Sequence, residues 1–171
     1  MQRSQVFFMN KISTTFLLVL LTCIFTACGF QLRGVTELSF KTLYVQGAKL
    51  SITQDLKRSF KTNSITVVDS AAEAELILEL LNEANEKQIL SLSGGGLVRE
   101  FELIYRVSFR TRETGAAVFS PVQTIQLRRD FSYNDNALLG KGEEEARLNS
   151  DMRNDAIREI MRRLSAIKKS H

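Results

Sequence analysis

The segment from Glu100 to Arg112 alternates apolar and polar residues over its whole length. One series is apolar or aromatic and consists of Phe101, Leu103, Tyr105, Val107 and Phe109. The intervening series is mostly polar and consists of Glu102, Ile104, Arg106, Ser108 and Arg110. A period of two over this length predicts a β-strand with one face on a core and the other face in water.

Two further long strands are predicted around this segment. Residues 76–81 alternate in the same way, although a helix is the competing prediction because Leu and Glu both favour helices. We favour a strand because the segment continues through residues 88–92 into a glycine turn at residues 93–96. After a turn at Thr114-Gly115, residues 117–129 return as a third strand. Pro121 lies inside it and lacks an N–H, which predicts a sheet edge or a bulge there.

A shorter unit precedes this meander. Residues 43–45 form a short strand candidate that ends at Gly47. Ile52, Leu56 and Phe60 are spaced by four, which predicts an amphipathic helix over residues 51–62 with Ser51 or Thr53 as its cap. A β-branched run at residues 65–68 follows, so the unit resembles a small βαβ motif with parallel strands.

A long helix is predicted at the C-terminal end of the chain. Residues 130–142 are polar and rich in turn formers, and the helix is expected to start near Glu143. Its apolar positions repeat every four residues: Leu148, Met152, Ala156, Ile160 and Leu164. The expected fold is α/β of the α+β type, a two-layer sandwich with two main helices packed on one face of a mixed sheet.

The N-terminal region has the layout of an export signal. Two basic residues are followed by the apolar run Phe16–Phe25 and by Thr26-Ala27-Cys28-Gly29. The ending resembles a bacterial lipobox, which predicts a signal peptide over residues 1–27 and lipid on Cys28. The alternative is an ordinary secreted protein with an incidental cysteine, and translation could start at Met1 or Met9.

Composition bounds the mature chain, residues 28–171. Removal of residues 1–27 takes away two basic residues and no acidic one, which lowers the formal net charge from +4 to +2. With no long basic block left, a nucleic-acid partner is disfavoured. Cys28 would be the only remaining cysteine, so no disulfide is expected and the fold must depend on packing.

Patterns typical of enzymes are weak. The only histidine is the terminal His171, and no set of catalytic or metal-ligand residues is apparent. Asp130, Asp135 and Asp151 could form a carboxylate pair, but loop solubility explains them better. The glycines of residues 93–96 lead into a strand, whereas a phosphate-binding loop leads into a helix. We therefore expect a binding or assembly protein with no catalytic residues, no metal and no cofactor.

The mature chain resembles the LPS-assembly lipoprotein family, LptE. The resemblance rests on the opening after the lipobox, Gly29-Phe30-Gln31-Leu32-Arg33-Gly34, and on the order strand, helix, strand and three long strands. A third element is Asp135-Asn136-Ala137-Leu138-Leu139-Gly140-Lys141 before an acidic helix start.

The resemblance implies a four-stranded sheet with two helices and a lipid-anchored location at the outer membrane, with which Gly29 after the cysteine is consistent. It implies a partner, a large LptD-like β-barrel LPS-assembly protein that this chain would plug, and help in inserting lipopolysaccharide into the outer leaflet. It also implies contact with the anionic head of lipopolysaccharide through basic residues, with Lys141 first and Arg128 and Arg129 as weaker candidates.

A lipoprotein of another class remains open at this point. The chain could be a lipid-anchored module that binds the cell wall, or a lipoprotein hydrolase. Wet-face arginines at Arg106, Arg110, Arg112 and Arg128 suit a polar barrel lumen, and they equally suit an ordinary solvated surface.

Overall fold

The computed structural model of the protein describes residues 38–133 and 138–167. The predicted signal peptide, Cys28 and the opening motif lie outside these residues, and Asp135 and His171 do as well. The described residues belong to one compact unit, Thr36–His171. Its elements are β1 (Thr42–Gly47), α2 (Thr53–Thr62), β2 (Thr66–Val68), the 3-10 turn η1 (Ala71–Glu73), β3 (Leu76–Leu92), β4 (Val98–Glu113), β5 (Gln123–Ser132) and α3 (Leu138–Ser165).

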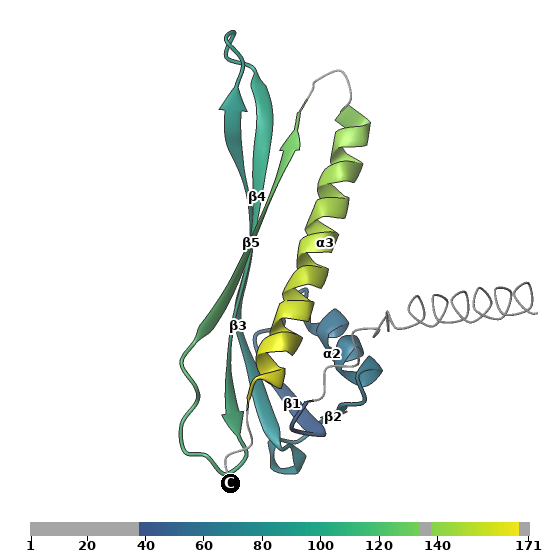
Figure 1. Ribbon diagram of the computed structural model, residues 1–171, viewed down its shortest axis with the longest axis vertical. Helices are drawn as coiled ribbons and strands as arrows, with labels where there is room; N and C mark the ends of the chain where they lie inside the picture. The colour runs from purple at the N-terminus through teal and green to yellow at the C-terminus, as the bar shows by residue number, and fades with distance from the viewer. Residues whose placement is uncertain (1–37, 134–137, 168–171) are drawn as a thin grey trace, which may run out of the picture. The chain divides into compact units, whose positions relative to one another are not determined.

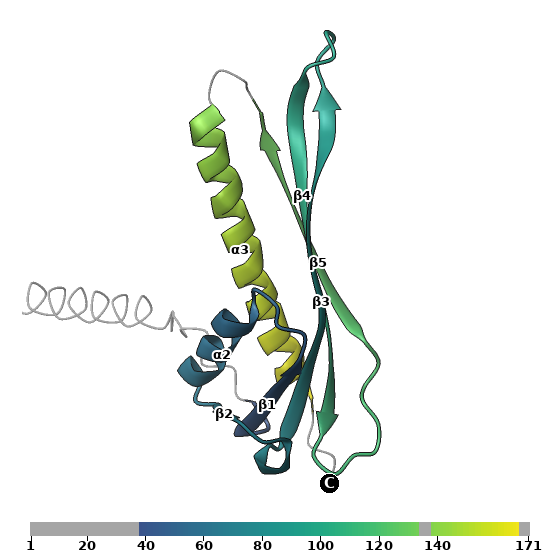
Figure 2. The ribbon, with the colours of Figure 1, turned by 180° about the vertical axis from the view of Figure 1, so that it is seen from behind.

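These strands form one mixed sheet in the order β2-β1-β3-β4-β5, with α2 and α3 on the same side of it (Figure 1). In the view from behind, both helices again lie to one side of the strands and no described helix lies on the other side (Figure 2). We call these two surfaces the covered face and the open face. The predicted α+β sandwich is confirmed, but the expectation of four strands is wrong, because the three-residue β2 adds a fifth strand at the edge.

The βαβ unit forms as predicted. β1 pairs in parallel with β2 on one side and with β3 on the other. β1 ends at Gly47, whose φ of +97° lies in the left-handed region. A Cβ at this position would lie 2.1 Å from the carbonyl oxygen of Leu80, so the close approach of β1 to β3 requires glycine here.

The three long strands form the predicted antiparallel meander. β3 pairs with β4 over nearly its whole length, which leaves no room for the helical alternative at residues 76–81. The register of this pair shifts between Leu80 and Asn82, so Leu81 is the extra residue of a bulge. Because of this extra residue, the even-numbered residues of β3 lie on the covered face before the bulge, and the odd-numbered residues lie on it after the bulge.

β5 begins later than predicted, at Gln123 rather than near residue 117. It is an edge strand, as Pro121 indicated. On the N-terminal side of the proline, the Ser120 N–H also contacts β4 and donates to the Thr111 carbonyl oxygen at 2.7 Å. Phe109 pairs with Gln123, so the β5 side has one more residue than β4 between these contacts. Pro121 therefore lies in a bulge-like interruption of the β4–β5 pairing, where the sheet requires no hydrogen bond from a backbone N–H.

The core lies between the covered face and the two helices. The predicted helical positions Ile52, Leu56 and Phe60 of the α2 segment are fully buried, as are Met152 and Ile160 of α3. From the sheet, the predicted series of β4 is buried at Leu103, Tyr105, Val107 and Phe109, together with Leu76, Leu78 and Leu80 of β3. Each such side chain contributes roughly 1.5–3 kcal/mol when removed from water, so the packing of this layer dominates stability.

The start of α2 is capped differently from the prediction. Neither Ser51 nor Thr53 accepts a hydrogen bond from the first turn, and no side chain caps the helix locally. Instead, the carboxylate of Glu83 on β3 accepts hydrogen bonds from the Ser51 N–H at 2.6 Å and from the Ile52 N–H at 3.4 Å. The buried Tyr105 hydroxyl donates to the same carboxylate at 2.7 Å. A β3 side chain thus satisfies the helix N-terminus, an arrangement that no local sequence pattern reveals.

Burial opposes ionisation of the Glu83 carboxyl, but the hydrogen bonds from Tyr105, Ser51 and Ile52 outweigh it and hold the Glu83 pKa below its ordinary value. Burial, with the nearby Glu83 carboxylate, raises the pKa of Tyr105. Glu83 is therefore ionised and Tyr105 neutral at physiological pH, which is the pairing that these hydrogen bonds require.

Candidate functional site

Lys141, the first candidate for lipopolysaccharide contact, lies in the first turn of α3 and not at a loop tip. The expectation that the helix starts near Glu143 is therefore wrong. The Lys141 ammonium donates to Glu144 at 2.7 Å and to the Ser132 hydroxyl at 3.3 Å, and its side chain is only 18% exposed. These contacts connect the start of α3 to the end of β5, which explains why the helix begins before Gly142 despite the low helix propensity of glycine.

The other two candidates, Arg128 and Arg129, are neighbours on β5 and so point to opposite faces of the sheet. Arg129 faces α3, where its guanidinium forms an ion pair with Asp155 at 2.6 Å. Arg128 lies on the open face and approaches Glu102 at 3.2 Å, with 55% of its side chain exposed. The structure therefore does not bring the three predicted cations together into one site.

The open face of the long strands carries a series of cross-strand polar pairs. Arg106 of β4 donates to Glu86 of β3 at 2.5 Å and to Gln126 of β5 at 2.7 Å. The hydroxyls of Ser108 and Thr124 lie 2.9 Å apart. We call the set of pairs that crosses β3, β4 and β5 on this face the open-face ladder; its ion pairs are Arg110–Glu79, Arg106–Glu86 and Arg128–Glu102.

Carboxylates inside this ladder are held in their charged form. A hydrogen bond from Arg110 is the main cause that keeps the pKa of Glu79 below its usual value, and Gln46 of β1 donates to the same carboxylate at 3.1 Å. Arg112, the fourth wet-face arginine, forms no ion pair in the described parts of the chain and donates instead to the Ala116 carbonyl oxygen at 3.1 Å. Each arginine of the ladder has a nearby acidic partner, so the ladder is polar but carries little unpaired charge. It differs from the basic, unpaired surface that binding of an anion by charge alone would require.

Sequence reasoning missed the acidic half of this ladder. It identified the wet-face arginines but not Glu79, Glu86 and Glu102, which form ion pairs with three of the four. Charges on neighbouring strands can be paired only once the register is known, and the bulge at Leu81 changes that register.

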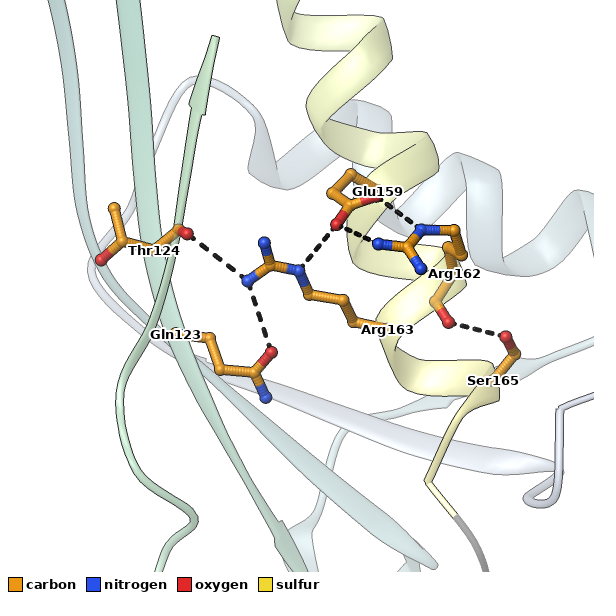
Figure 3. A network of polar contacts seen from close by, with 6 residues as sticks. All are labelled: Gln123, Thr124, Glu159, Arg162, Arg163 and Ser165. Carbon is orange, nitrogen blue, oxygen red and sulfur yellow. Dashed lines mark hydrogen bonds and ion pairs between the residues drawn. The ribbon is translucent and has the colours of Figure 1, made fainter.

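On the covered face, polar contacts attach α3 to the sheet along its length. Lys87 of β3 forms an ion pair with Glu145 at 2.5 Å near the start of α3. Figure 3 shows the contact near its end, where Arg163 reaches the Thr124 carbonyl oxygen of β5 at 3.4 Å and Glu159 at 2.8 Å. Glu159 also accepts two hydrogen bonds from Arg162, and these arginines lower its pKa to about 2. Arg129–Asp155 belongs to the same set, so Arg129 serves primarily to hold α3.

The catalytic alternatives gain no geometric support in the described residues. Asp130 and Asp151 are exposed, on β5 and α3. Residues 93–96 form the predicted hairpin tip, closed by the Ser93 N–H to Leu97 carbonyl hydrogen bond at 2.7 Å. Across residues 38–133 and 138–167, no group of three His, Cys, Asp or Glu side chains could hold a metal ion. Within the same ranges, no helix is both long and apolar enough to cross a membrane.

Comparison with protein families gives a match over residues 40–164 to the LptE model, described as lipopolysaccharide-assembly. This chain belongs to the LptE family. The match covers every strand and helix of the described fold and leaves out only Ser165, the last residue of α3.

Relatives agree with this assignment. The chain is 25% identical over 159 residues to the LPS-assembly lipoprotein LptE of Photorhabdus laumondii, which covers 90% of this chain and 85% of the relative. It is 24% identical over 158 residues to the protein of the same name in Yersinia pestis, covering 90% and 75%.

Solved structures extend the similarity to the fold. A lipoprotein B of Nitrosomonas europaea, solved in solution, is 42% identical with a TM-score of 0.72, covering 81% of this chain and 91% of that chain. The rare lipoprotein B of Shewanella oneidensis, solved by crystallography, is 27% identical with a TM-score of 0.66, covering 73% and 94%. The LptE-family fold is thus shared with proteins that are themselves named lipoproteins.

Proposed function

We propose that this LptE-family protein is a lipid-anchored, non-catalytic component of lipopolysaccharide assembly at the outer membrane. In this proposal it occupies the lumen of a large LptD-like β-barrel partner, assists the assembly of that barrel, and helps to insert lipopolysaccharide into the outer leaflet. Its relatives are named for LPS assembly. The observation that carries the proposal is the open-face ladder, a broad polar surface whose charges are already paired.

A paired polar surface suits the interior of a large barrel for a physical reason. A barrel lumen is polar and contains water, so an occupant must present hydrogen-bonding groups rather than an apolar patch. Unpaired buried charges in such a place would cost free energy, whereas the arginines of the ladder keep their carboxylate partners when water is displaced. Arg106, which bridges two strands at the middle of the ladder, is then the central position of the proposed contact.

Affinity capture of the lipidated chain from detergent-solubilised outer membrane tests the partner. We expect a large β-barrel protein to co-purify, and we expect Arg106→Glu to reduce its recovery. Lys61→Glu is the matched control, because it reverses one exposed charge on α2, away from the open face. Thermal unfolding of both variants separates loss of the partner from loss of the fold. Equal recovery with both variants would show that the open face does not contact the barrel.

Lipid attachment at Cys28, after removal of residues 1–27, is part of the same proposal. A Cys28→Ser protein should remain an uncleaved precursor and lack the acyl mass by intact mass spectrometry. Each buried acyl CH₂ contributes roughly 0.8 kcal/mol, so lipid chains suffice to anchor the protein. Normal processing of the variant would contradict the assignment.

For contact with the anionic head of lipopolysaccharide, we infer a different order among the predicted cations. Arg128 is the most exposed of the three, and its distance to Glu102 is the longest of their ion pairs. It can therefore turn toward a phosphate at the lowest cost. Arg129 and Lys141 would have to release α3 contacts first, so they rank behind it.

A further inference from the structure

The two edges of the sheet differ in length. β2 has three residues, whereas β5 has ten and is followed by no further strand in the described part of the chain. A long edge strand presents a row of N–H and C=O groups that can pair with a strand of another molecule, and a very short edge strand offers few of them. β5 is therefore the edge at which a second copy of the chain could extend the sheet.

Alternate residues of β5 direct their backbone groups away from β4. The Tyr133 N–H, just beyond β5, donates to the Arg99 carbonyl oxygen at 2.7 Å, and the register between β4 and β5 is continuous along the whole of β5. Backbone groups alternate in direction along a strand, so the odd-numbered residues of β5 pair with β4 and the even-numbered residues face outward. The outward carbonyl groups include those of Thr124 and Arg128.

Guanidinium groups occupy both of these carbonyl oxygens. Arg129 turns back and donates to the Arg128 carbonyl oxygen at 2.8 Å. Figure 3 shows the other contact, in which Arg163 extends from α3 to β5 and donates to the Thr124 carbonyl oxygen at 3.4 Å. Both guanidinium groups would have to leave before the backbone N–H groups of an added strand could take their places.

Carboxylates of α3 hold the two guanidinium groups at this edge. Asp155 forms an ion pair with Arg129 at 2.6 Å, and Glu159 forms one with Arg163 at 2.8 Å. The step from Asp155 to Arg163 is about 12 Å along a helix. The two outward carbonyl groups are about 13 Å apart along the strand. α3 thus supplies an anchor for one donor, and the other donor itself, at the spacing of these carbonyl groups.

Attachment of α3 to the sheet does not by itself account for these contacts. The ion pair with Asp155 would hold the helix alone, yet Arg129 also donates to the carbonyl oxygen of the residue before it. A carbonyl group that faces water needs no donor from the protein, because water satisfies it. Occupying this group has a consequence when another strand could bind there.

We propose that Arg129 and Arg163 close the β5 edge to strand pairing with a second copy of this chain, and so keep the protein monomeric. A second copy is the partner to be excluded because its own β5 presents the same row of outward groups. Two such edges placed antiparallel are self-complementary about a twofold axis. The proposal does not depend on the barrel partner, since it concerns the chain before any partner is bound.

Two double variants test the proposal with an equal loss of charge. Arg129→Ala/Arg163→Ala removes both donors from the edge. Arg128→Ala/Arg162→Ala is the matched control, because these residues are the chain neighbours of the two donors. Their guanidinium groups bind carboxylates and donate to no outward carbonyl group of β5 within the described residues. The full lipidated chain is studied in a large excess of detergent micelles, so that the lipid anchors do not bring two chains together.

Sedimentation velocity then measures self-association. We expect Arg129→Ala/Arg163→Ala to form dimers at concentrations about tenfold or more below those that the control requires, because each lost contact is worth a factor of about five in an equilibrium constant. Arg163→Ala alone should show a smaller shift of the same sign relative to Arg162→Ala. Hydrogen exchange locates the contact, since the outward N–H of Gln126 should become protected in the dimer.

Asp155→Ala separates closure of the edge from attachment of α3. It removes the ion pair with the helix but leaves Arg129 beside the Arg128 carbonyl group, so this variant should remain monomeric. Thermal unfolding checks that every variant is folded. Dimers of Asp155→Ala in the same concentration range would assign the effect to loosening of α3 and overturn the proposal. So would a monomeric Arg129→Ala/Arg163→Ala chain, equal association of the control, or dimers in which the Gln126 N–H stays unprotected.

Discussion

The covered and open faces of the sheet are stabilised by different interactions, although the same strands form both. On the covered face of β4, Leu103, Val107 and Phe109 are almost completely buried against the helices. On the open face, Arg106 and Arg110 form ion pairs with carboxylates of β3. Apolar burial is worth several kcal/mol for a large side chain, whereas a partly exposed ion pair is worth about 1 kcal/mol or less. The covered face therefore holds the fold together, and the open face is available for recognition.

The largest expected effect comes from emptying the covered face. Phe109→Ala should lower the free energy of unfolding by about 3–5 kcal/mol, because Phe109 is fully buried and its removal leaves a cavity. Arg110→Ala, one residue further on the open face, should cost less than about 1 kcal/mol. Urea unfolding of both variants measures the difference. Similar losses would mean that the covered and open faces contribute equally to the free energy of unfolding.

A polar exception on the covered face gives the second prediction. Glu83→Ala should cost about 1–3 kcal/mol, since it leaves the buried Tyr105 hydroxyl and the Ser51 N–H at the start of α2 without their acceptor. Glu86→Ala removes a carboxylate three residues away on the open face, half exposed, and should cost under about 1 kcal/mol. Hydrogen exchange of the first turn of α2 should increase in the Glu83 variant alone. Unchanged exchange there would show that Glu83 does not support the helix.

The polar contacts that attach α3 to the covered face include one whose stabilising effect depends on pH, at Glu159. The pKa of Glu159 is about 2 in the folded protein, below its ordinary value of 4.5. The stabilisation from Glu159 is therefore complete above about pH 4.5 and is lost as the pH falls toward 2. Glu159→Gln should cost at most about 1 kcal/mol at pH 7, because the pair is partly exposed, and this cost should fall toward zero near pH 2.

Urea unfolding at pH 7 and near pH 2 measures this change. Glu143→Gln is the control, an exposed glutamate of α3 that has no ion pair within the described part of the chain. A cost of Glu159→Gln that does not vary with pH would contradict the assignment of the lowered pKa to this carboxylate.

The elements that the sequence predicted correctly are those in which one local period decides the structure. The spacing by four in α2 and α3 and the alternation in β4 follow from burial of a single face, and no other part of the chain is needed to recognise them. The turn at residues 93–96 was also recognisable locally, because its glycines separate two strand patterns.

The errors arose where distant residues decide. Residues 117–122 have strand-forming composition, but Pro121 and the pairing of Ser120 with Thr111 delay β5 to Gln123. Gly140 and Gly142 favour a loop locally, whereas contacts of Lys141 extend α3 across them. The ladder partners depend on a register that a single bulge residue, Leu81, alters. A candidate site built from cations alone was incomplete because their acidic partners lie elsewhere in the fold, Glu102 on β4 and Glu144 and Asp155 on α3.

The smallest expected effect on stability, and the sharpest test of the open face, concerns the cations proposed to contact lipopolysaccharide. Arg128→Asp removes the exposed arginine of the ladder, and Lys141→Asp removes the lysine that the sequence ranked first. Because Arg128 is more exposed and Lys141 is held by Glu144 and Ser132, lipopolysaccharide binding should fall more for Arg128→Asp. An exposed contact of up to about 1 kcal/mol corresponds to a loss of affinity of about fivefold or less. The loss should shrink as salt is added, since exposed charges are screened over about 8–10 Å near physiological ionic strength.

Binding measured by titration at low and high salt, with Lys61→Asp on α2 as the control, separates the candidates. A larger loss for Lys141→Asp would restore the order that the sequence suggested, and unchanged binding in both variants would remove these cations from the proposed function while leaving the barrel contact to be judged by co-purification.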